Sequence, residues 1–343
     1  MDAAGGRLIA ADGNVRLGIF SEAIADVNYR DYALTTPFGR PAWRWARHFG
    51  FNQFQFLGAL SEDLVFGCAL ADIKYAGTAF VYLYEPSSRR LAEHSFQAPL
   101  ARGIRFDQAP ETGRASLQSR RAQIEMRAGV APHHRRLAVT VTGGPTIEAY
   151  FDEETPPQQP MRISTRAGAT GWVFARKTAG MPVSGRVRWN GREFDLAAIG
   201  ARGHCDWSAG YMRRETFWNW GCLAGTTANG RTLGMNVACG VNETSFTENC
   251  FWLDGALHKI DSVAFTYDRT DLMRPWRLQS FDGRLDLAFE PQASHAEQLN
   301  AWIVASNFHQ LFGRYHGRLV TAVGEEIRLA GMLGYAESHY AKW

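Results

Sequence analysis

The chain has 343 residues, with 45% hydrophobic residues, 21% charged residues and a formal net charge of +3. This composition is typical of a soluble globular protein, and the length allows two domains of ordinary size or one large β domain. The small net charge gives no support to nucleic-acid binding or to a general attraction by an anionic membrane. The aromatic content of 13%, with 11 tryptophans, is typical of strands or of cavities for apolar or sugar-like ligands.

Signals that would direct the chain to another compartment are missing from the sequence. The first residues, MDAAGGRLIAADGNVRLG, do not show the charged and apolar regions of a signal peptide. No apolar stretch approaches the roughly 18 to 20 residues that a membrane-spanning helix needs. The five cysteines are odd in number and show no CxxC spacing, which favours buried free thiols over a disulfide framework. We therefore expect a soluble, cytoplasmic protein.

The first half of the chain is expected to be rich in strands. Residues 51–86 alternate apolar and polar side chains and then become almost continuously apolar, and Ser116 to Gly129 also fits a strand. The segment FDEETPPQQPM, Phe151 to Met161, carries an acidic run and three prolines, so it cannot continue a central strand. It predicts either a boundary between domains 1–160 and 161–343 or a long surface loop within one domain.

The second half carries strong turn signals. Four Asn-Gly or Asp-Gly pairs, at residues 190–191, 229–230, 254–255 and 282–283, separate alternating runs and suit type I′ turns between antiparallel strands. Helical periodicity is weak, and the one expected helix covers Ala296 to Phe308, where Leu299, Trp302 and Ile303 form a stripe. This pattern predicts an all-β fold, mainly antiparallel, built as a barrel or sandwich with few short helices.

The stretch GHCDWSAG, Gly203 to Gly210, is the main candidate for a functional site. If it forms a strand, the two-residue period places His204 and Asp206 on one face and Cys205 and Trp207 on the other. Residues i and i+2 of a strand lie roughly 6.5 Å apart. An imidazole and a carboxyl group at that distance can share a cavity and change each other's pKa.

Nearby aromatic and acidic residues extend this candidate site. Trp218 and Trp220 in FWNWG share a face, and indole rings around Asp206 would desolvate its carboxyl group and keep it protonated as a general acid. Alternatively, Asp206 accepts backbone hydrogen bonds at a turn and the tryptophans belong to the core. Glu248, in the segment TENCFWLDG with Trp252, faces either solvent or a cavity.

Other polar residues have simpler interpretations. Asp282 fits a turn, Asp286 the outer face of a strand, and Glu337 with His339 share one face of a C-terminal strand, at the surface or in a site. The sequence has no GxGxxG, GxxxxGK[ST], GxSxG or HExxH motif and no histidine spacing typical of zinc. We therefore expect neither a cofactor nor a metal.

Several long segments, found in the same order, resemble the bacterial domain-of-unknown-function family 2804. They include GHCDWSAGYMRRETFWNWG, TENCFWLDGALHK, SFDGRLDLAFEP and NFHQLFGRYHG. The resemblance covers nearly the whole chain. That family is defined by sequence alone, so it implies no activity.

A more distant similarity is to the carotenoid hydratase, tocopherol cyclase and AttH-like group, carried by PVSGRVRWNG, GHCDWSAG and WNWG in that order. This similarity implies two lipocalin-like (calycin-type) β-barrels packed together. It also implies that Asp206 takes the place of the motif's aspartate, which is the proposed proton donor of the hydratases. Three positions depart from the motif: Trp207 replaces a histidine, Ala209 replaces a tryptophan, and His204 stands where an aromatic residue is common. The cavity can therefore hold different chemistry, or none.

The leading hypothesis is an enzyme that acts on a lipophilic, isoprenoid-like alkene by acid-initiated hydration, cyclisation or isomerisation. Protonated Asp206 would donate to the double bond, and His204 would orient or recharge this acid. The residues expected to bind the substrate or stabilise the cation are Trp207, Trp218, Trp220, Glu248 and Trp252.

Two other functions use the same residues. A non-catalytic carrier or sensor of lipids needs the barrels but no acid. A carbohydrate-active protein would use the aromatic residues as sugar platforms, although no suitable carboxylate pair stands out. The expected partner is a small lipophilic ligand and not nucleic acid, while peripheral contact with membrane lipids and the oligomeric state stay open.

Overall fold

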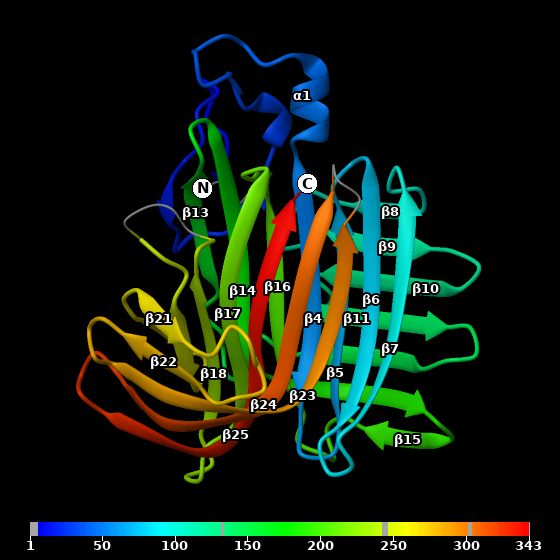
Figure 1. Cartoon of the computed structure of the whole chain (residues 1–343), viewed down its shortest axis with the longest axis vertical. Helices are drawn as coiled ribbons and strands as arrows, with labels where there is room; N and C mark the ends of the chain where they lie inside the picture. The colour runs from blue at the N-terminus through cyan, green and yellow to red at the C-terminus, as the bar shows by residue number, and fades with distance from the viewer. Residues whose placement is uncertain (1–5, 132–133, 242–245, 301–303, 343) are drawn as a thin grey trace.

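The computed structural model describes residues 6–131, 134–241, 246–300 and 304–342, most of them in antiparallel strands (Figure 1). Two large sheets, of 14 and 9 strands, form one nearly closed barrel and one half-barrel. Helix accounts for 3% of the chain, in α1 (Arg44–Phe49) and the 3-10 helix η1 (Tyr29–Asp31). A short parallel pair, β1 (Gly6–Arg7) and β3 (Ile24–Asp26), completes the described elements. The expected all-β, mainly antiparallel fold is confirmed.

The larger sheet has the order β7-β6-β5-β4-β16-β14-β12-β11-β10-β9-β8, with β13 and β15 paired to β14 and β2 paired to β13. Its strands are β2 (Gly18–Ile19), β4 (Asn52–Leu60), β5 (Val65–Asp72), β6 (Ala76–Glu85), β7 (Arg90–Pro99), β8 (Ile104–Phe106), β9 (Arg114–Gln118), β10 (Ala122–Ala128), β11 (Arg135–Val141), β12 (Thr146–Phe151), β13 (Met161–Ala167), β14 (Gly171–Trp189), β15 (Arg192–Asp195) and β16 (Arg202–Tyr211).

The smaller sheet has the order β20-β19-β18-β17-β25-β24-β23-β22-β21. Its strands are β17 (Glu215–Thr226), β18 (Thr232–Cys239), β19 (Cys250–Leu253), β20 (Ala256–Lys259), β21 (Val263–Thr266), β22 (Trp276–Ser280), β23 (Leu285–Asn300), β24 (Ala305–Val320) and β25 (Glu326–Lys342). The sheets thus change between Tyr211 and Glu215, and β13, β14 and β16 belong to the larger one. The division of the chain into domains 1–160 and 161–343 stays a prediction.

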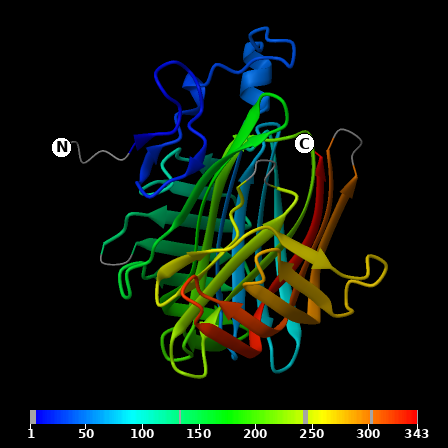
Figure 2. The same cartoon turned by 90° about the vertical axis from the view of Figure 1, so that its left-hand side faces the viewer.

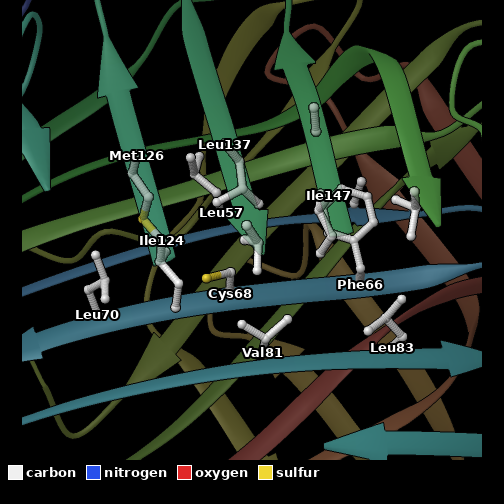
Figure 3. Packing of buried hydrophobic residues seen from close by; sticks show 14 of the residues in the cluster. Leu57, Phe66, Cys68, Leu70, Val81, Leu83, Ile124, Met126, Leu137 and Ile147 are labelled. Carbon is white, nitrogen blue, oxygen red and sulfur yellow. The ribbon is translucent and has the colours of Figure 1, made fainter. Parts of the chain in front are cut away.

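The larger sheet bends over itself and encloses a hydrophobic core. Strands β10 to β12 run across strands β4 to β6 (Figure 1). Leu57, Phe66 and Val81 of β4 to β6 face Ile124 and the side chains beside it (Figure 3). The opposite face of β4 to β6 packs against the smaller sheet. Because β4 and β5 are buried on both faces, the second half of β4 and nearly all of β5 are apolar and lose the usual alternation.

Two of the four expected type I′ turns are confirmed. Asn190 and Gly191 both have positive φ (50° and 71°), as do Asp254 and Gly255 (50° and 82°), and each pair joins adjacent strands. At 229–230 and 282–283 only the glycine has positive φ. These two connections form wider turns, so the type I′ prediction was wrong there.

The expected helix from Ala296 to Phe308 is wrong. The described part of this segment lies in the hairpin of β23 and β24, which pair from Leu285 opposite Leu319 to Asn300 opposite Ala305. Trp302 and Ile303 lie outside the described residues. The long ladder of backbone hydrogen bonds overrides a weak helical stripe, and Leu299 is 49% exposed.

The described helices include none that is long and apolar enough to cross a membrane. The five cysteines are free thiols, and four of them are buried.

Candidate functional site

Strand β16 carries the stretch singled out in the sequence, and it has the expected alternation. The face with His204 and Asp206 is directed at the smaller sheet, whereas Cys205 joins the core of the larger sheet. Trp207 packs against Phe174, with ring centroids 6.0 Å apart, in a separate cluster with the N-terminal segment. The space between the two sheets is therefore where the functional candidates meet.

Two paired glycines, Gly58 and Gly67, lie on the face of the larger sheet that is directed at the smaller one. We call this layer, with His204 and Tyr82 on either side, the floor. His204 lies opposite Gly58, Gly58 opposite Gly67, and Gly67 opposite Tyr82 on four neighbouring strands. Directly opposed residues of antiparallel strands project to the same face. A Cβ atom on Gly58 would lie 2.7 Å from Nε2 of His204, and one on Gly67 would lie 2.4 Å from the hydroxyl oxygen of Tyr82. The imidazole and the phenol occupy the room that the missing side chains leave.

The His204 imidazole is enclosed by aromatic rings of both sheets. Its centroid lies 5.0 Å from that of Phe56, 5.2 Å from Tyr335 on β25 and 6.1 Å from Trp220 on β17. Burial, followed by the positive charge of Lys177, lowers the pKa of His204 to about 3. The imidazole is therefore neutral near physiological pH.

Three buried polar groups gather at this floor: Nε2 of His204, which has no hydrogen-bond partner among the described residues, and the hydroxyls of Tyr82 and Tyr335, which interact with each other. Burial, and next the neighbouring Tyr335, raise the pKa of Tyr82 well above its usual value, and burial also raises the pKa of Tyr335. Both phenols keep their protons. Buried polar groups are normally satisfied, so the partnerless Nε2 of His204 beside this pair of hydroxyls indicates a place for a polar atom of a ligand or for water.

A buried ion network adjoins the floor. Lys177 of β14 lies opposite Asp206, and its Nζ is 2.9 Å from Oδ2 of Asp206 and 2.6 Å from Oε1 of Glu248. Ser208 donates to the other oxygen of Asp206 over 2.7 Å. Burial opposes the ammonium charge, but the two carboxylates outweigh it and raise the pKa of Lys177. An ammonium has three N–H donors, so one is left for another acceptor.

The remaining predicted site residues have fixed partners. Trp220 donates its indole N–H to Asn236 over 2.7 Å, and the amide of Asn236 donates to Oε1 of Glu248 over 3.3 Å. Trp218 donates to Glu337 over 2.7 Å and lies 4.2 Å from the ring of His339.

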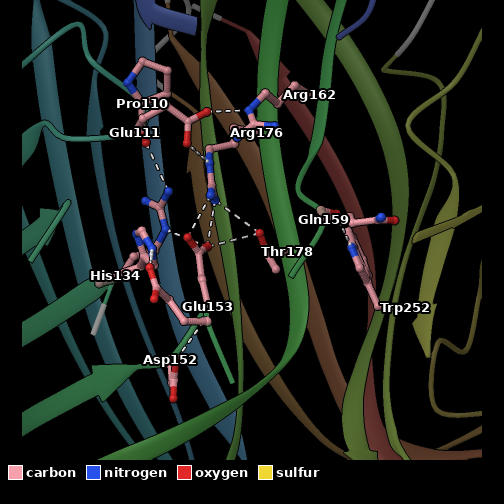
Figure 4. A network of polar contacts seen from close by, with 12 residues as sticks. Pro110, Glu111, His134, Asp152, Glu153, Gln159, Arg162, Arg176, Thr178 and Trp252 are labelled. Carbon is pink, nitrogen blue, oxygen red and sulfur yellow. Dashed lines mark hydrogen bonds and ion pairs between the residues drawn. The ribbon is translucent and has the colours of Figure 1, made fainter. Parts of the chain in front are cut away.

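Trp252 is held at the edge of this layer. It donates its indole N–H to the backbone carbonyl of Gln159 over 2.7 Å (Figure 4). The structure therefore brings His204, Asp206, Trp220 and Glu248 together, with Trp218 in a neighbouring group. It does not bring in Trp207, which faces the opposite side.

The other face of β14 carries a second buried ion network. Arg176 donates to both oxygens of Glu153 over 2.9 and 2.8 Å, and Arg135 donates to Glu153 over 3.0 Å (Figure 4). Burial disfavours the charge of Glu153, but the two guanidinium groups outweigh it and lower its pKa. This network ties β11 and β14 to the segment at Glu153 inside the larger sheet, away from the floor. We assign it a structural role.

A further histidine borders the layer. His295 of β23 is 2% exposed, its Nδ1 contacts Glu93 of β7, and its ring lies 5.8 Å from that of Tyr82. Its Nε2 also lacks a partner among the described residues. Within the same described residues, no group of three or more His, Cys, Asp or Glu side chains is placed to hold a metal ion.

Comparisons with known proteins identify the family. Residues 3–343 match the family model described as "Domain of unknown function (DUF2804)". The chain belongs to the DUF2804 family. A comparison of the DUF2804 chain with curated proteins gave no match.

Solved structures share the fold at low sequence identity. The crystal structure of CghA matches with a TM-score of 0.54 and 11% identity, covering 98% of the DUF2804 chain and 97% of CghA. CghA with Sch210972 matches with a TM-score of 0.52 and 12% identity, covering 85% and 88%. A putative AttH from Nitrosomonas europaea matches with a TM-score of 0.52 and 13% identity, covering 84% and 91%. The distant similarity to the AttH-like group is confirmed at the level of the fold.

Sequence reasoning missed several residues of the site in the DUF2804 chain: Lys177, Tyr82, Tyr335, His295 and Glu93. Lys177 is one of only four lysines, and it stands beside Arg176 in the mostly apolar run GWVFARKTAGM. A rare charge inside an apolar strand was the one signal that pointed to it. The tyrosines and His295 carry no local signal, because their neighbours come from distant parts of the chain.

Proposed function

We propose that the DUF2804 chain is an enzyme that hydrates, cyclises or isomerises a small lipophilic molecule with a carbon–carbon double bond conjugated to a carbonyl group. The observation that carries this proposal is the partnerless Nε2 of His204 beside the interacting pair of Tyr82 and Tyr335 hydroxyls. Protonated phenols and a neutral imidazole are hydrogen-bond donors suited to a carbonyl oxygen. The surrounding aromatic rings suit an apolar ligand body.

In this proposal, the donors stabilise the negative charge that develops on the carbonyl oxygen during addition or rearrangement. The Lys177 ammonium adds a fixed positive charge beside them, and its effect is strong because the site is buried. Removing one such donor typically costs 100-fold to 1,000-fold in turnover, about 2.7–4 kcal/mol.

The role of Asp206 follows from its contacts. Both of its oxygens are engaged, one by Lys177 and one by Ser208. We therefore propose that Asp206 keeps Lys177 charged and in position. Direct donation of a proton by Asp206 to an alkene would first require this ion pair to be broken.

The proposal is tested by incubating the purified protein with an organic extract of bacterial lipids in D₂O and following lipophilic species by mass spectrometry. Hydration or isomerisation introduces solvent deuterium at carbon, and cyclisation gives a species of unchanged mass and altered chromatographic retention. Tyr82→Phe removes one hydroxyl and should lower the conversion about 100-fold or more. Tyr211→Phe removes a hydroxyl from the opposite face of β16, beside Trp207, so it is the matched control and should convert as the wild type does.

Conversion that is equal in the wild type and in Tyr82→Phe would refute the role of the floor. A protein that retains a lipophilic molecule through purification, yet leaves both this molecule and the extract unchanged, would instead be a carrier or sensor. A retained sugar would overturn both functions.

A further inference from the structure

One segment at the surface is not used by the proposed site. The turn after Thr36 and helix α1, residues 37–49, stand beyond the ends of the strands in both views (Figures 1 and 2). Every residue of α1 is exposed or half-buried. A short helix of a globular protein normally buries an apolar face against the core, so α1 has a face that this chain does not cover.

The exposed side chains of this segment are large and aromatic. Phe38 is 92% exposed, Trp43 81% and Trp45 65%. Phe38 lies on the tight turn closed by the hydrogen bond from the Gly39 amide to the Thr36 carbonyl. Other strongly exposed apolar side chains, such as Leu100 and Phe281, lie in separate turns at distant points of the sequence. Clustered exposed aromatic residues mark interaction surfaces, whereas single ones do not.

The segment carries positive charges and no negative ones. Residues 32–61 contain Arg40, Arg44 and Arg47 and no aspartate or glutamate. These three positive charges equal the formal net charge of the whole chain, so the remainder of the chain is formally neutral. Arg47 is tied to the backbone carbonyl of Tyr32, while Arg40 and Arg44 are exposed, with Arg44 placed 5.9 Å above the ring of Trp45.

We propose that residues 37–49 form a membrane-docking surface that binds the headgroup region of a bilayer with anionic lipids. Tryptophan favours the membrane–water interface, and arginine pairs with lipid phosphates. A segment that alternates aromatic and basic residues and has no acidic ones can place its rings in the membrane–water interface and its arginines at the lipid phosphates at the same time. A protein partner would also accept the aromatic side chains, but it would not account for the absence of acidic residues.

The surface adjoins the strand that forms part of the floor. Helix α1 ends at Phe49, and β4 begins at Asn52 and continues to Phe56 and Gly58. Docking of this surface would hold one end of β4 at the lipid bilayer, from which a lipophilic substrate would come. The docking surface nevertheless rests on its own observations and stands whether or not the chain is an enzyme.

The test is co-sedimentation of the full-length protein with vesicles of phosphatidylcholine, alone or mixed with phosphatidylglycerol. The wild type should sediment with the mixed vesicles, and added salt should weaken this binding. Phe38→Ala/Trp43→Ala/Trp45→Ala should lower the partition coefficient about tenfold or more. Arg40→Gln/Arg44→Gln should lower it about twentyfold on mixed vesicles at low salt and little on pure phosphatidylcholine.

Phe281→Ala is the matched control, because it removes an equally exposed ring at a distant turn and should bind as the wild type does. All replaced side chains are exposed, so thermal unfolding of the variants should stay unchanged. Wild-type protein that stays in the supernatant with both kinds of vesicle would overturn the proposal. So would an aromatic triple variant that sediments fully, or a Phe281→Ala variant that loses as much binding as the triple variant.

Discussion

The glycine floor makes Gly58→Ala the most informative single substitution. The new Cβ atom would lie 2.7 Å from Nε2 of His204 and 2.9 Å from the backbone carbonyl oxygen of Phe66. The imidazole must then move, and the strand must shift slightly because the carbonyl cannot rotate away. Overpacking of this kind costs about 1–3 kcal/mol. In a chain of this length, that corresponds to a lowering of Tm by roughly 1–4 °C.

This loss of stability is modest, whereas the effect on the site should be large. We expect Gly58→Ala to remain folded by circular dichroism and to lose most of the conversion seen in the D₂O assay. Gly225→Ala in β17 is the matched control, because its Cβ atom would first meet the flexible side chain of Met332 at 3.2 Å. It should change neither property strongly.

A double-mutant cycle identifies the cause of the instability. In a His204→Ala background the imidazole is gone, so Gly58→Ala should cost less stability than it does in the wild type. An equal cost in both backgrounds would show that the imidazole does not occupy the space over Gly58. Full conversion by Gly58→Ala would refute the role of the floor in catalysis.

Three further substitutions test the charges. The pKa of His204 is lowered from 6.5 to about 3 on folding, so the unfolded chain binds more protons between these values and stability falls as the pH drops from about 6.5 towards 3. Chemical denaturation across this range measures how the free energy of unfolding changes with pH. This slope should be smaller in His204→Phe than in the wild type, by up to about 1.4 kcal/mol per pH unit. Glu153→Gln leaves two buried arginines without their shared carboxylate and should destabilise the fold by about 3–5 kcal/mol, whereas Glu154→Gln, 64% exposed, should change it by under about 0.5 kcal/mol. Lys177→Met should cost about 3–5 kcal/mol in chemical denaturation, because it removes the cation shared by the Asp206 and Glu248 carboxylates.

The sequence predicted features that depend on neighbouring residues. The alternation of β16 follows from the two-residue period, and the turns at Asn190-Gly191 and Asp254-Gly255 follow from the tolerance of Asn, Asp and Gly for positive φ. The segment Ala296 to Phe308 shows the limit of this approach. Its apolar spacing fits a helix or a strand, and only the pairing with β25 and the rest of β24 decides for the strand.

The candidate site could be predicted only in part, because its groups meet through pairing across two sheets. His204 and Asp206 were found from a local motif, yet the partner that defines Asp206 is Lys177 on another strand. The Tyr82 and Tyr335 hydroxyls come from β6 and β25, more than 250 residues apart in sequence. No pattern within one strand encodes that Tyr82 and Tyr335 face each other.

The residues Ala175 to Lys177 show how one strand serves both sheets. In the sequence, Arg176 and Lys177 form a basic pair of the kind usually found at a solvated surface. The two-residue period of β14 instead sends Arg176 into the core of the larger sheet, to Glu153, and Lys177 into the space between the sheets, to Asp206. Each buried cation is compensated by carboxylates that reach it from other segments, so a shift of β14 by one residue would give one network the wrong cation and leave the other without any. The charges therefore fix the register of β14, and with it the position of Asp206 and His204 on the neighbouring strand.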